Sequence, residues 1–371
     1  MLEQLKIENF RCFKSFELNH LGRVNLLVGQ NNSGKTSVLE AAHLLYSGGN
    51  LESFKKIMTN RGEFIWNRNR RNLRAKQYAV SHLFYQHELD FSSEISISGL
   101  DDNYKKELHI YLKENLKDNE SFDGEFSLDI DEYDTHTSLI ANYVSLHKQN
   151  KIQEYGLIYD SDFWLYSLSS LGGETEEIIS KLQYINSSSL TTQATINLFN
   201  QIVLQPEEDL VYQSLRNIEP NIERLASITS DRITRSDNYH RGFVVKLSNT
   251  NQRIPIGSMG DGIWRMLGIV LSLVSAKDGV LLVDEIDTGL HYTALEGMWK
   301  LIWETSKKLN VQVFATTHNS DCWKALEALT SREDVGEEDI SIQRIEKDAP
   351  RSVAYNKEEI ATAVEREIEV R

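Results

Sequence analysis

The amino-acid sequence predicts an α/β fold, in which a mixed sheet is flanked by helices and the middle of the chain forms a β-rich, partly helical insertion. A short, mostly apolar run at 24–28 indicates a buried strand. After the glycine-rich loop that follows it, apolar residues recur at helical spacing over 36–46. A strand–helix–strand pattern then occupies 280–316. Two buried strands joined by one helix imply a right-handed crossover and parallel pairing.

The remaining elements are expected from local patterns. Residues 1–20 alternate as an antiparallel strand pair that leads into the strand at 24–28. The segment 91–199 carries short alternating runs separated by polar turns, which is typical of a β-rich insertion. We further expect helices over 38–90 with a break at 47–50, over 205–228 with a bend at Pro220, over 262–276, over 293–308 and over 357–367, and a strand at 340–342.

Bulk composition restricts the class of protein. The chain has 371 residues and a formal net charge of −15, which argues against a surface that coats nucleic acid throughout. It has no apolar run long enough for a membrane span and no signal-peptide pattern, so we expect a cytoplasmic protein without a membrane partner. The two cysteines, Cys12 and Cys322, are far apart and indicate core residues rather than a disulfide or zinc site.

A phosphate-binding loop follows the first buried strand. It fits the pattern G-x-x-x-x-G-K-[ST], in which glycines let successive N–H groups point at phosphate oxygens. Lys35 is expected to reach the β- and γ-phosphates of ATP or GTP, and the Thr36 hydroxyl to bind Mg²⁺. The residues of this loop are Gly29, Gln30, Asn31, Asn32, Ser33, Gly34, Lys35, Thr36 and Ser37.

Two carboxylates end the apolar strand at 280–283. Because α/β sheets bind ligands at the carboxyl ends of their strands, Asp284 is expected to hold Mg²⁺ and Glu285 to polarise the attacking water. An apolar strand followed by Asp-Glu is a weak pattern alone, and a plain strand end is its alternative. The phosphate loop in the same chain favours the functional interpretation.

Two further motifs contain residue types that suit a contact with phosphate. Ser258, Gly260 and Asp261 precede an apolar helix, where backbone N–H groups bind phosphate; a capped glycine turn is the alternative. His318 directly follows the buried strand at 311–316 and suits a γ-phosphate contact; an ordinary strand-end histidine is the alternative.

These four motifs resemble those of ATP-binding-cassette (ABC) ATPases of the SMC/RecF/OLD group (OLD, overcoming lysogenization defect). The resemblance implies a P-loop NTPase with an ABC-ATPase-like core. The opening Leu5–Phe13 is similar to the N-terminal "NFR.F" element of the group, which would place Arg11 near the nucleotide. The stretch Glu285–His291 resembles the "E-x-x-x-G-L-H" loop of OLD-type ATPases. Gln86 is the candidate for the family's glutamine beside Mg²⁺.

The resemblance implies a discontinuous ATPase domain, residues 1–90 and 200–371, interrupted by an insertion of unknown role at 91–199. It further implies ATP and Mg²⁺ as cofactors, hydrolysis with Lys35, Glu285 and His318 as catalytic residues, and a head-to-tail homodimer that sandwiches ATP, with a higher oligomer left open. No long coiled coil is present, and the residues after His318 are too few for the TOPRIM nuclease domain of OLD proteins.

We therefore expect a sensor or regulator that acts on a separate effector, a nuclease or toxin, in antiphage defence or DNA metabolism. The alternatives are a DNA-binding repair clamp like RecF and a nucleotide-dependent scaffold with little turnover. The basic segment 61–76 has two interpretations, contacts with the phosphates of DNA or RNA and a solvated surface. The solvated surface is favoured. The acidic segment 101–134 is expected to be a solvated surface.

Overall fold

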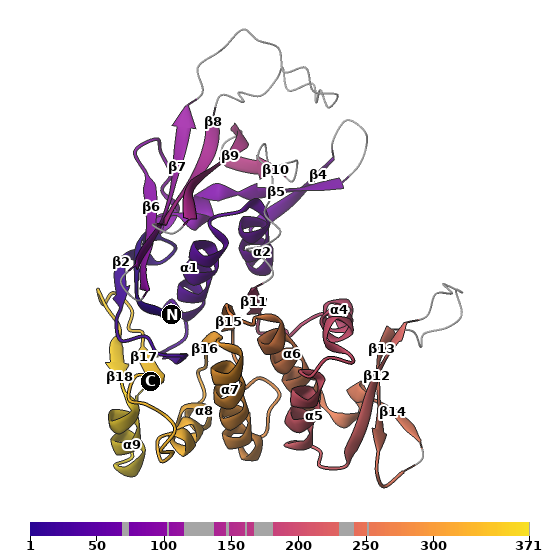
Figure 1. Cartoon of the computed structure of the whole chain (residues 1–371). Helices are drawn as coiled ribbons and strands as arrows, with labels where there is room; N and C mark the ends of the chain where they lie inside the picture. Colours follow the sequence, from indigo (N-terminus) through magenta and orange to yellow (C-terminus); the bar gives the residue numbers. More distant parts are fainter. Residues whose placement is uncertain are drawn as a thin grey trace. The chain divides into compact units, whose positions relative to one another are not determined.

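The computed structural model describes residues 1–68, 74–101, 104–114, 137–145, 148–159, 162–166, 181–229, 241–250 and 252–370. The chain divides into two compact units, each assembled from separate stretches of sequence (Figure 1). Unit 1 contains Met1–Asn19, Thr36–Ile179 and Glu346–Ser352, and unit 2 contains His20–Lys35, Ser180–Ile345 and Val353–Arg371.

Unit 2 is built on a six-stranded sheet with the strand order β11-β15-β16-β3-β17-β18. Neighbouring strands pair in parallel, except that β18 runs antiparallel to β17. The sheet is therefore mixed, as the sequence predicts, and β3, β15 and β16 end at the same edge. The strands are β3 (Val24–Val28), β11 (Leu182–Ile185), β15 (Val280–Val283), β16 (Gln312–Thr316), β17 (Ile340–Arg344) and β18 (Val353–Tyr355).

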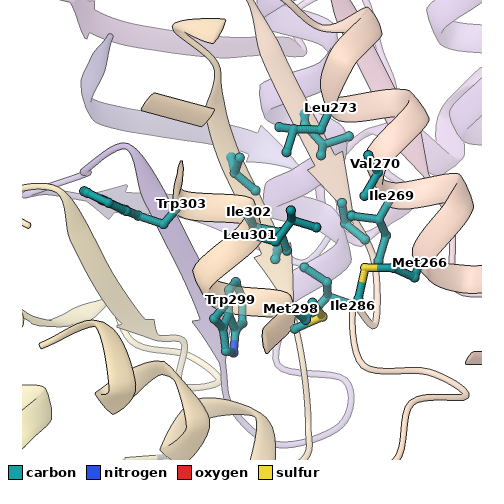
Figure 2. Packing of buried hydrophobic residues seen from close by; sticks show 14 of the residues in the cluster. Met266, Ile269, Val270, Leu273, Ile286, Met298, Trp299, Leu301, Ile302 and Trp303 are labelled. Atoms are coloured by element: carbon teal, nitrogen blue, oxygen red, sulfur yellow. The ribbon is translucent and has the colours of Figure 1, made fainter. Parts of the chain in front are cut away.

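Helices and a small second sheet complete unit 2. Helix α6 is buried along most of its length, and its apolar residues pack against α7. Figure 2 shows Met266 of α6 close to Ile286 and Met298, all of them fully buried. The helices are α4 (Thr192–Ile202), α5 (Glu208–Arg216), α6 (Asp261–Ser275), α7 (Leu295–Leu309), α8 (Ser320–Ala325) and α9 (Lys357–Glu365), and the second sheet contains β12 (Ile222–Thr229), β13 (Arg241–Leu247) and β14 (Arg253–Pro255).

Unit 1 contains a nine-stranded antiparallel sheet with the order β2-β1-β6-β7-β8-β9-β10-β5-β4. Helices α1 (Lys35–Ser47) and α2 (Leu51–Arg61) pack on it, and at their junction the Tyr155 hydroxyl donates to the Gly49 carbonyl at 2.9 Å. The strands are β1 (Leu2–Phe10), β2 (Phe13–Leu18), β4 (Phe64–Arg68), β5 (Arg74–Ala79), β6 (Glu94–Asp101), β7 (Tyr104–Glu114), β8 (Thr137–Ser145), β9 (Lys148–Tyr159) and β10 (Phe163–Tyr166).

Two helical expectations are wrong. The chain beyond Gly62 forms the β4–β5 hairpin, because Gly62 adopts a left-handed conformation that ends α2. The helix expected over 205–228 ends at Arg216, and β12 follows Pro220. A β-bulge between Ile222 and Arg224 leaves Ile222 and Leu225 buried three residues apart, a spacing that imitates a helix.

The two compact units are divided at other residues than 90 and 199, and the assignment of an ATPase domain and an insertion stays a prediction. Strand β11 and helix α4 precede residue 200, yet they belong to unit 2, where β11 pairs with β15. Conversely, residues 36–90 belong to unit 1, in the same stretch as the segment that begins at residue 91. Residues 102–103 and 115–134 of the acidic segment, and 69–73 of the basic segment, lie outside the described residues. Within the described residues, no helix has the length and apolar character needed to cross a bilayer.

Candidate nucleotide-binding site

The loop between β3 and α1 has the backbone of a phosphate cradle. Gly29, Asn32 and Gly34 have φ values of 143°, 63° and 105°, a region that favours glycine. A Cβ atom at Gly29 would lie 2.3 Å from the Ile345 carbonyl oxygen, so only glycine fits there. The buried Ser33 hydroxyl has no hydrogen-bond partner among the described residues. A phosphate oxygen would provide one, so the loop fits a nucleotide.

The Lys35 amine lies at the end of this loop, where it is buried. It donates to the carbonyls of Gly29 at 2.7 Å and Gln30 at 2.9 Å. Burial lowers the pKa of Lys35, and the negative charges of Glu285 and Asp284 oppose that shift. An amine that bonds only to neutral carbonyls can exchange them for charged phosphate oxygens, which form stronger hydrogen bonds.

The end of β15 holds the two predicted carboxylates in a fixed arrangement. The Thr316 hydroxyl donates to Asp284 Oδ1 at 2.7 Å and accepts from the Glu285 backbone N–H at 2.8 Å. Glu285 has a φ of 50°, a left-handed conformation that costs a non-glycine residue about 1–3 kcal/mol. Strain of this kind persists where surrounding bonds impose it, and Thr316 supplies one of them.

His318 reaches the same edge from the end of β16. Its Nδ1 lies 2.5 Å from Glu285 Oε2, and its side chain is 61% exposed. Asp287 holds the loop that carries this histidine, because it accepts from Thr317 Oγ1 at 2.7 Å and from Asn319 Nδ2 at 3.0 Å. Sequence reasoning assigned no role to Asp287 or to the Thr316 hydroxyl.

Sequence reasoning also missed Arg265, a fully buried arginine on α6. One of its terminal nitrogens, Nη2, donates to the carbonyls of Asp284 at 2.7 Å and Glu285 at 2.8 Å. The other, Nη1, donates to the Asn186 carbonyl at 2.9 Å and to Ser189 Oγ at 3.1 Å. Burial lowers the pKa of Arg265 to about 10. The signal in the sequence was a lone arginine inside an otherwise apolar helix.

The motif expected to bind a second phosphate group lies at the N-terminus of α6. Ser258, Gly260 and Asp261 are exposed, and Gly260 has a φ of 97°. The first turn of α6 packs against the loop after β15, since a Cβ atom at Gly262 would lie 2.9 Å from the Gly289 carbonyl oxygen. These three residues lie on a different element from Lys35, Glu285 and His318.

The remaining predicted residues belong to unit 1. Arg11 is buried and forms ion pairs with Glu40 Oε2 at 3.1 Å and with Glu63 Oε1 at 2.5 Å. Gln86 is exposed, and its side-chain nitrogen donates to the Tyr85 hydroxyl at 3.3 Å. The roles of Arg11 at the nucleotide and of Gln86 at a metal stay predictions.

Thr36 follows Lys35 on the first turn of α1, and Ser37 accepts a hydrogen bond from Arg61 at 3.1 Å. The described residues contain no group of three or more His, Cys, Asp or Glu side chains that could hold a metal ion. A nucleotide-bound Mg²⁺ needs no such group, because one or two side chains and the phosphates bind it. The roles of Thr36 and Asp284 as ligands of Mg²⁺ stay predictions.

Several known proteins are similar to this chain. An ATP/GTP phosphatase of Helicobacter pylori is 24% identical over 358 residues, which cover 90% of each chain. The RecF replication and repair protein of Rickettsia massiliae is 46% identical over 54 residues, 15% of either chain. An Smc head bound to the C-terminal winged-helix domain of ScpA has a TM-score of 0.48 at 12% identity, with 96% of this chain and 98% of that chain covered.

The SMC head domain of Thermotoga maritima gives a TM-score of 0.39 at 11% identity, with 96% of this chain and 98% of that chain covered. The family model of the AAA ATPase domain matches residues 1–322. That match includes the phosphate loop, both carboxylates of β15 and His318. The chain belongs to the AAA ATPase domain family and is a P-loop ATPase.

Proposed function

We propose that this chain binds ATP with Mg²⁺, hydrolyses it in a composite site formed by two copies, and thereby controls a separate effector protein. One observation supports the chemistry above all others. The side chains of Lys35, Glu285 and His318 follow three different strands and converge at one edge of the sheet. Such convergence is what phosphoryl transfer requires, because its catalysis is mostly positioning and charge stabilisation.

Each side chain has a distinct role in this proposal. Lys35 binds the β- and γ-phosphates after its amine leaves the carbonyls of Gly29 and Gln30. Glu285 orients the attacking water and accepts its proton, while His318 contacts the γ-phosphate from the neighbouring strand end. Thr36 and Asp284 would hold Mg²⁺, which neutralises phosphate charge when bound.

The position of Ser258, Gly260 and Asp261 supports the proposed dimer. These residues are exposed at the start of α6 and lie on a different element from the Lys35 loop. A helix N-terminus attracts phosphate through its free N–H groups and its dipole. In a head-to-tail dimer, Ser258 of one copy would therefore bind the ATP held by Lys35 of the other, and closure would depend on ATP.

Glu285→Gln tests the proposal. We expect this variant to bind ATP with unchanged affinity, to lose hydrolysis by about 100-fold or more, and to accumulate as an ATP-bound dimer. Light scattering after size-exclusion chromatography, with and without saturating ATP, measures the dimer. A variant that stays monomeric with ATP refutes the composite site, and a variant with normal turnover refutes the role of Glu285.

The effector assignment has its support in the sequence of the loop Glu285–His291, which resembles that of OLD-type ATPases. We propose a nuclease or toxin as the effector, and antiphage defence or DNA metabolism as the setting. Affinity capture of Glu285→Gln with ATP from the native host is expected to retain this effector, and Lys35→Ala is the matched control that should not. In vivo activity from this chain alone would contradict the proposal.

The short match to RecF favours a second candidate function, a DNA-binding repair clamp. That function predicts ATP hydrolysis stimulated by double-stranded DNA, with a stimulation that decreases steeply as salt rises. A steady-state hydrolysis assay at two salt concentrations distinguishes it from the effector-linked ATPase. The same assay identifies a third possibility, a nucleotide-dependent scaffold, by near-zero turnover despite tight ATP binding.

A further inference from the structure

Arg265 is a buried cation whose four hydrogen bonds all end on uncharged oxygens. Three of its acceptors are backbone carbonyls, those of Asn186, Asp284 and Glu285, and the fourth is the Ser189 hydroxyl. Burying a charge is expensive, and packing alone would be satisfied by an apolar side chain of similar volume. The guanidinium instead offers several donors in one rigid plane, which suits the task of fixing backbone groups.

The backbone that Arg265 holds is the strained part of the site. Glu285 adopts a left-handed conformation with a φ of 50°. Its N–H donates to Thr316 Oγ1 at 2.8 Å, and its carbonyl accepts from Arg265 Nη2 at the same distance. One bond on either side of the Cα atom therefore opposes rotation of the two flanking peptide groups. Rotation of either peptide would carry the Glu285 carboxylate away from His318.

The position of Arg265 in the chain adds a second connection. Helix α6 begins at Asp261, immediately after Ser258 and Gly260, and Arg265 lies one turn further along. The helix whose N-terminus faces solvent therefore also bonds to the residue that would activate water.

We infer that Arg265 is a positioning residue that fixes the left-handed backbone of Glu285 and thereby ties the catalytic carboxylate to helix α6. The inference rests on the proposed function, because it assumes that Glu285 orients the water. It predicts that loss of the guanidinium lowers kcat while ATP binding at the Lys35 loop persists. A purely structural role would lower thermal stability and leave the turnover of folded protein unchanged.

Arg265→Met removes the guanidinium and keeps a long unbranched side chain, and Arg265→Lys keeps the charge with fewer directed donors. We expect kcat to decrease at least tenfold in the Met variant and less in the Lys variant. The affinity for a fluorescent ATP analogue should stay within twofold in both. Should the Met variant fail to fold, the Lys variant, measured against wild type, is sufficient for the test.

The matched control is Trp299→Phe. It also removes a buried donor from a backbone carbonyl of unit 2, that of Cys322 at 2.9 Å, which belongs to helix α8 rather than to the end of β15. We expect a lower Tm and a kcat within twofold of wild type. If Trp299→Phe and Arg265→Met lower kcat equally, general destabilisation explains both and the inference fails.

A double-mutant cycle with Glu285→Gln makes the decisive measurement. If Arg265 acts through Glu285, Arg265→Met changes the residual hydrolysis of Glu285→Gln by less than twofold. Fully additive losses overturn the inference, and so does normal kcat in both Arg265 variants. Normal turnover in Glu285→Gln alone would instead overturn the proposed function, so the two failures are distinguishable.

Discussion

The two units each bury an arginine, and the two arginines have opposite surroundings. In unit 1, Arg11 forms ion pairs with Glu40 and Glu63, and Glu40 also pairs with Arg61 at 2.7 Å. In unit 2, Arg265 bonds to uncharged oxygens beside the candidate catalytic carboxylates. The charge of Arg11 is compensated by direct pairing with carboxylates, whereas the guanidinium of Arg265 holds backbone carbonyls in place.

The difference predicts which property a mutation changes in each unit, the stability of the fold or the activity. Breaking a compensated buried cluster leaves a charge unpaired and therefore lowers the stability of the fold. Under the proposed function, removing a charge from the sheet edge of unit 2 should instead change nucleotide binding or turnover. The following predictions test this contrast, from the largest expected effect to the smallest.

Lys35→Ala should abolish nucleotide binding. The affinity for ATP is expected to decrease at least about 100-fold, because a charge-assisted contact to phosphate is lost. The free energy of unfolding without nucleotide should change by only about 1 kcal/mol, since the amine bonds there to uncharged carbonyls. Isothermal calorimetry and urea denaturation measure the two quantities. Unchanged ATP affinity would refute the phosphate-loop assignment.

Glu40→Gln should show the opposite pattern. Glu40 is almost completely buried between Arg11 and Arg61, so its neutralisation is expected to lower the free energy of unfolding by about 3 kcal/mol. The same change in an Arg11→Met background should cost clearly less, because one of the cations that needs Glu40 is gone. Equal costs in both backgrounds, measured in urea, would show that the cluster is not coupled.

His43, on α1, gives unit 1 a pH dependence that we can assign. Burial lowers the pKa of His43 to about 3, against an ordinary value of 6.5. In the unfolded chain His43 therefore binds a proton below pH 6.5, whereas in the folded chain it binds one only below about pH 3. Stability from this group is complete above pH 6.5 and decreases as pH falls; the loss at pH 5 is about 2 kcal/mol.

The measurement compares urea denaturation of wild type and His43→Phe at pH 7 and pH 5. The wild type should lose about 2 kcal/mol more than the variant over this interval. Parallel losses would mean that other groups account for the acid sensitivity of the chain.

Glu52→Gln should have the smallest effect. Glu52 pairs with Lys55 at 2.8 Å, but its side chain is 72% exposed and solvent screens the pair. We expect the free energy of unfolding to change by less than about 0.5 kcal/mol. A change as large as that of Glu40→Gln would contradict the distinction between buried and exposed pairs.

Much of unit 2 could be predicted because its elements are locally encoded. The strands β3, β15 and β16 are short, mostly apolar and buried along their whole length. Parallel pairing then requires that Asp284, His318 and the phosphate loop meet at one edge. The mixed sheet and the P-loop ATPase class are confirmed, whereas the individual site roles stay predictions.

The parts that could not be predicted depend on contacts between distant residues. The partners of Arg265 come from two segments, around residues 186 and 285, which only the pairing of β11 with β15 brings together. The hairpin β4–β5 mixes apolar and basic residues over runs too short to separate a period of two from one of 3.6. The bulge in β12 gives its buried residues a spacing that is typical of a helix, so the strand was not predicted.

The left-handed backbone of Glu285 has a consequence for selection on stability alone. Glycine adopts this conformation without steric cost, so Glu285→Gly relieves strain while it removes the carboxylate. Directed evolution that selects only for thermal stability should therefore enrich glycine at position 285. The selected protein would be more stable but would lack the Glu285 carboxylate. Under the proposed function, position 285 is thus a site where the demands of folding and of turnover oppose each other within a single residue.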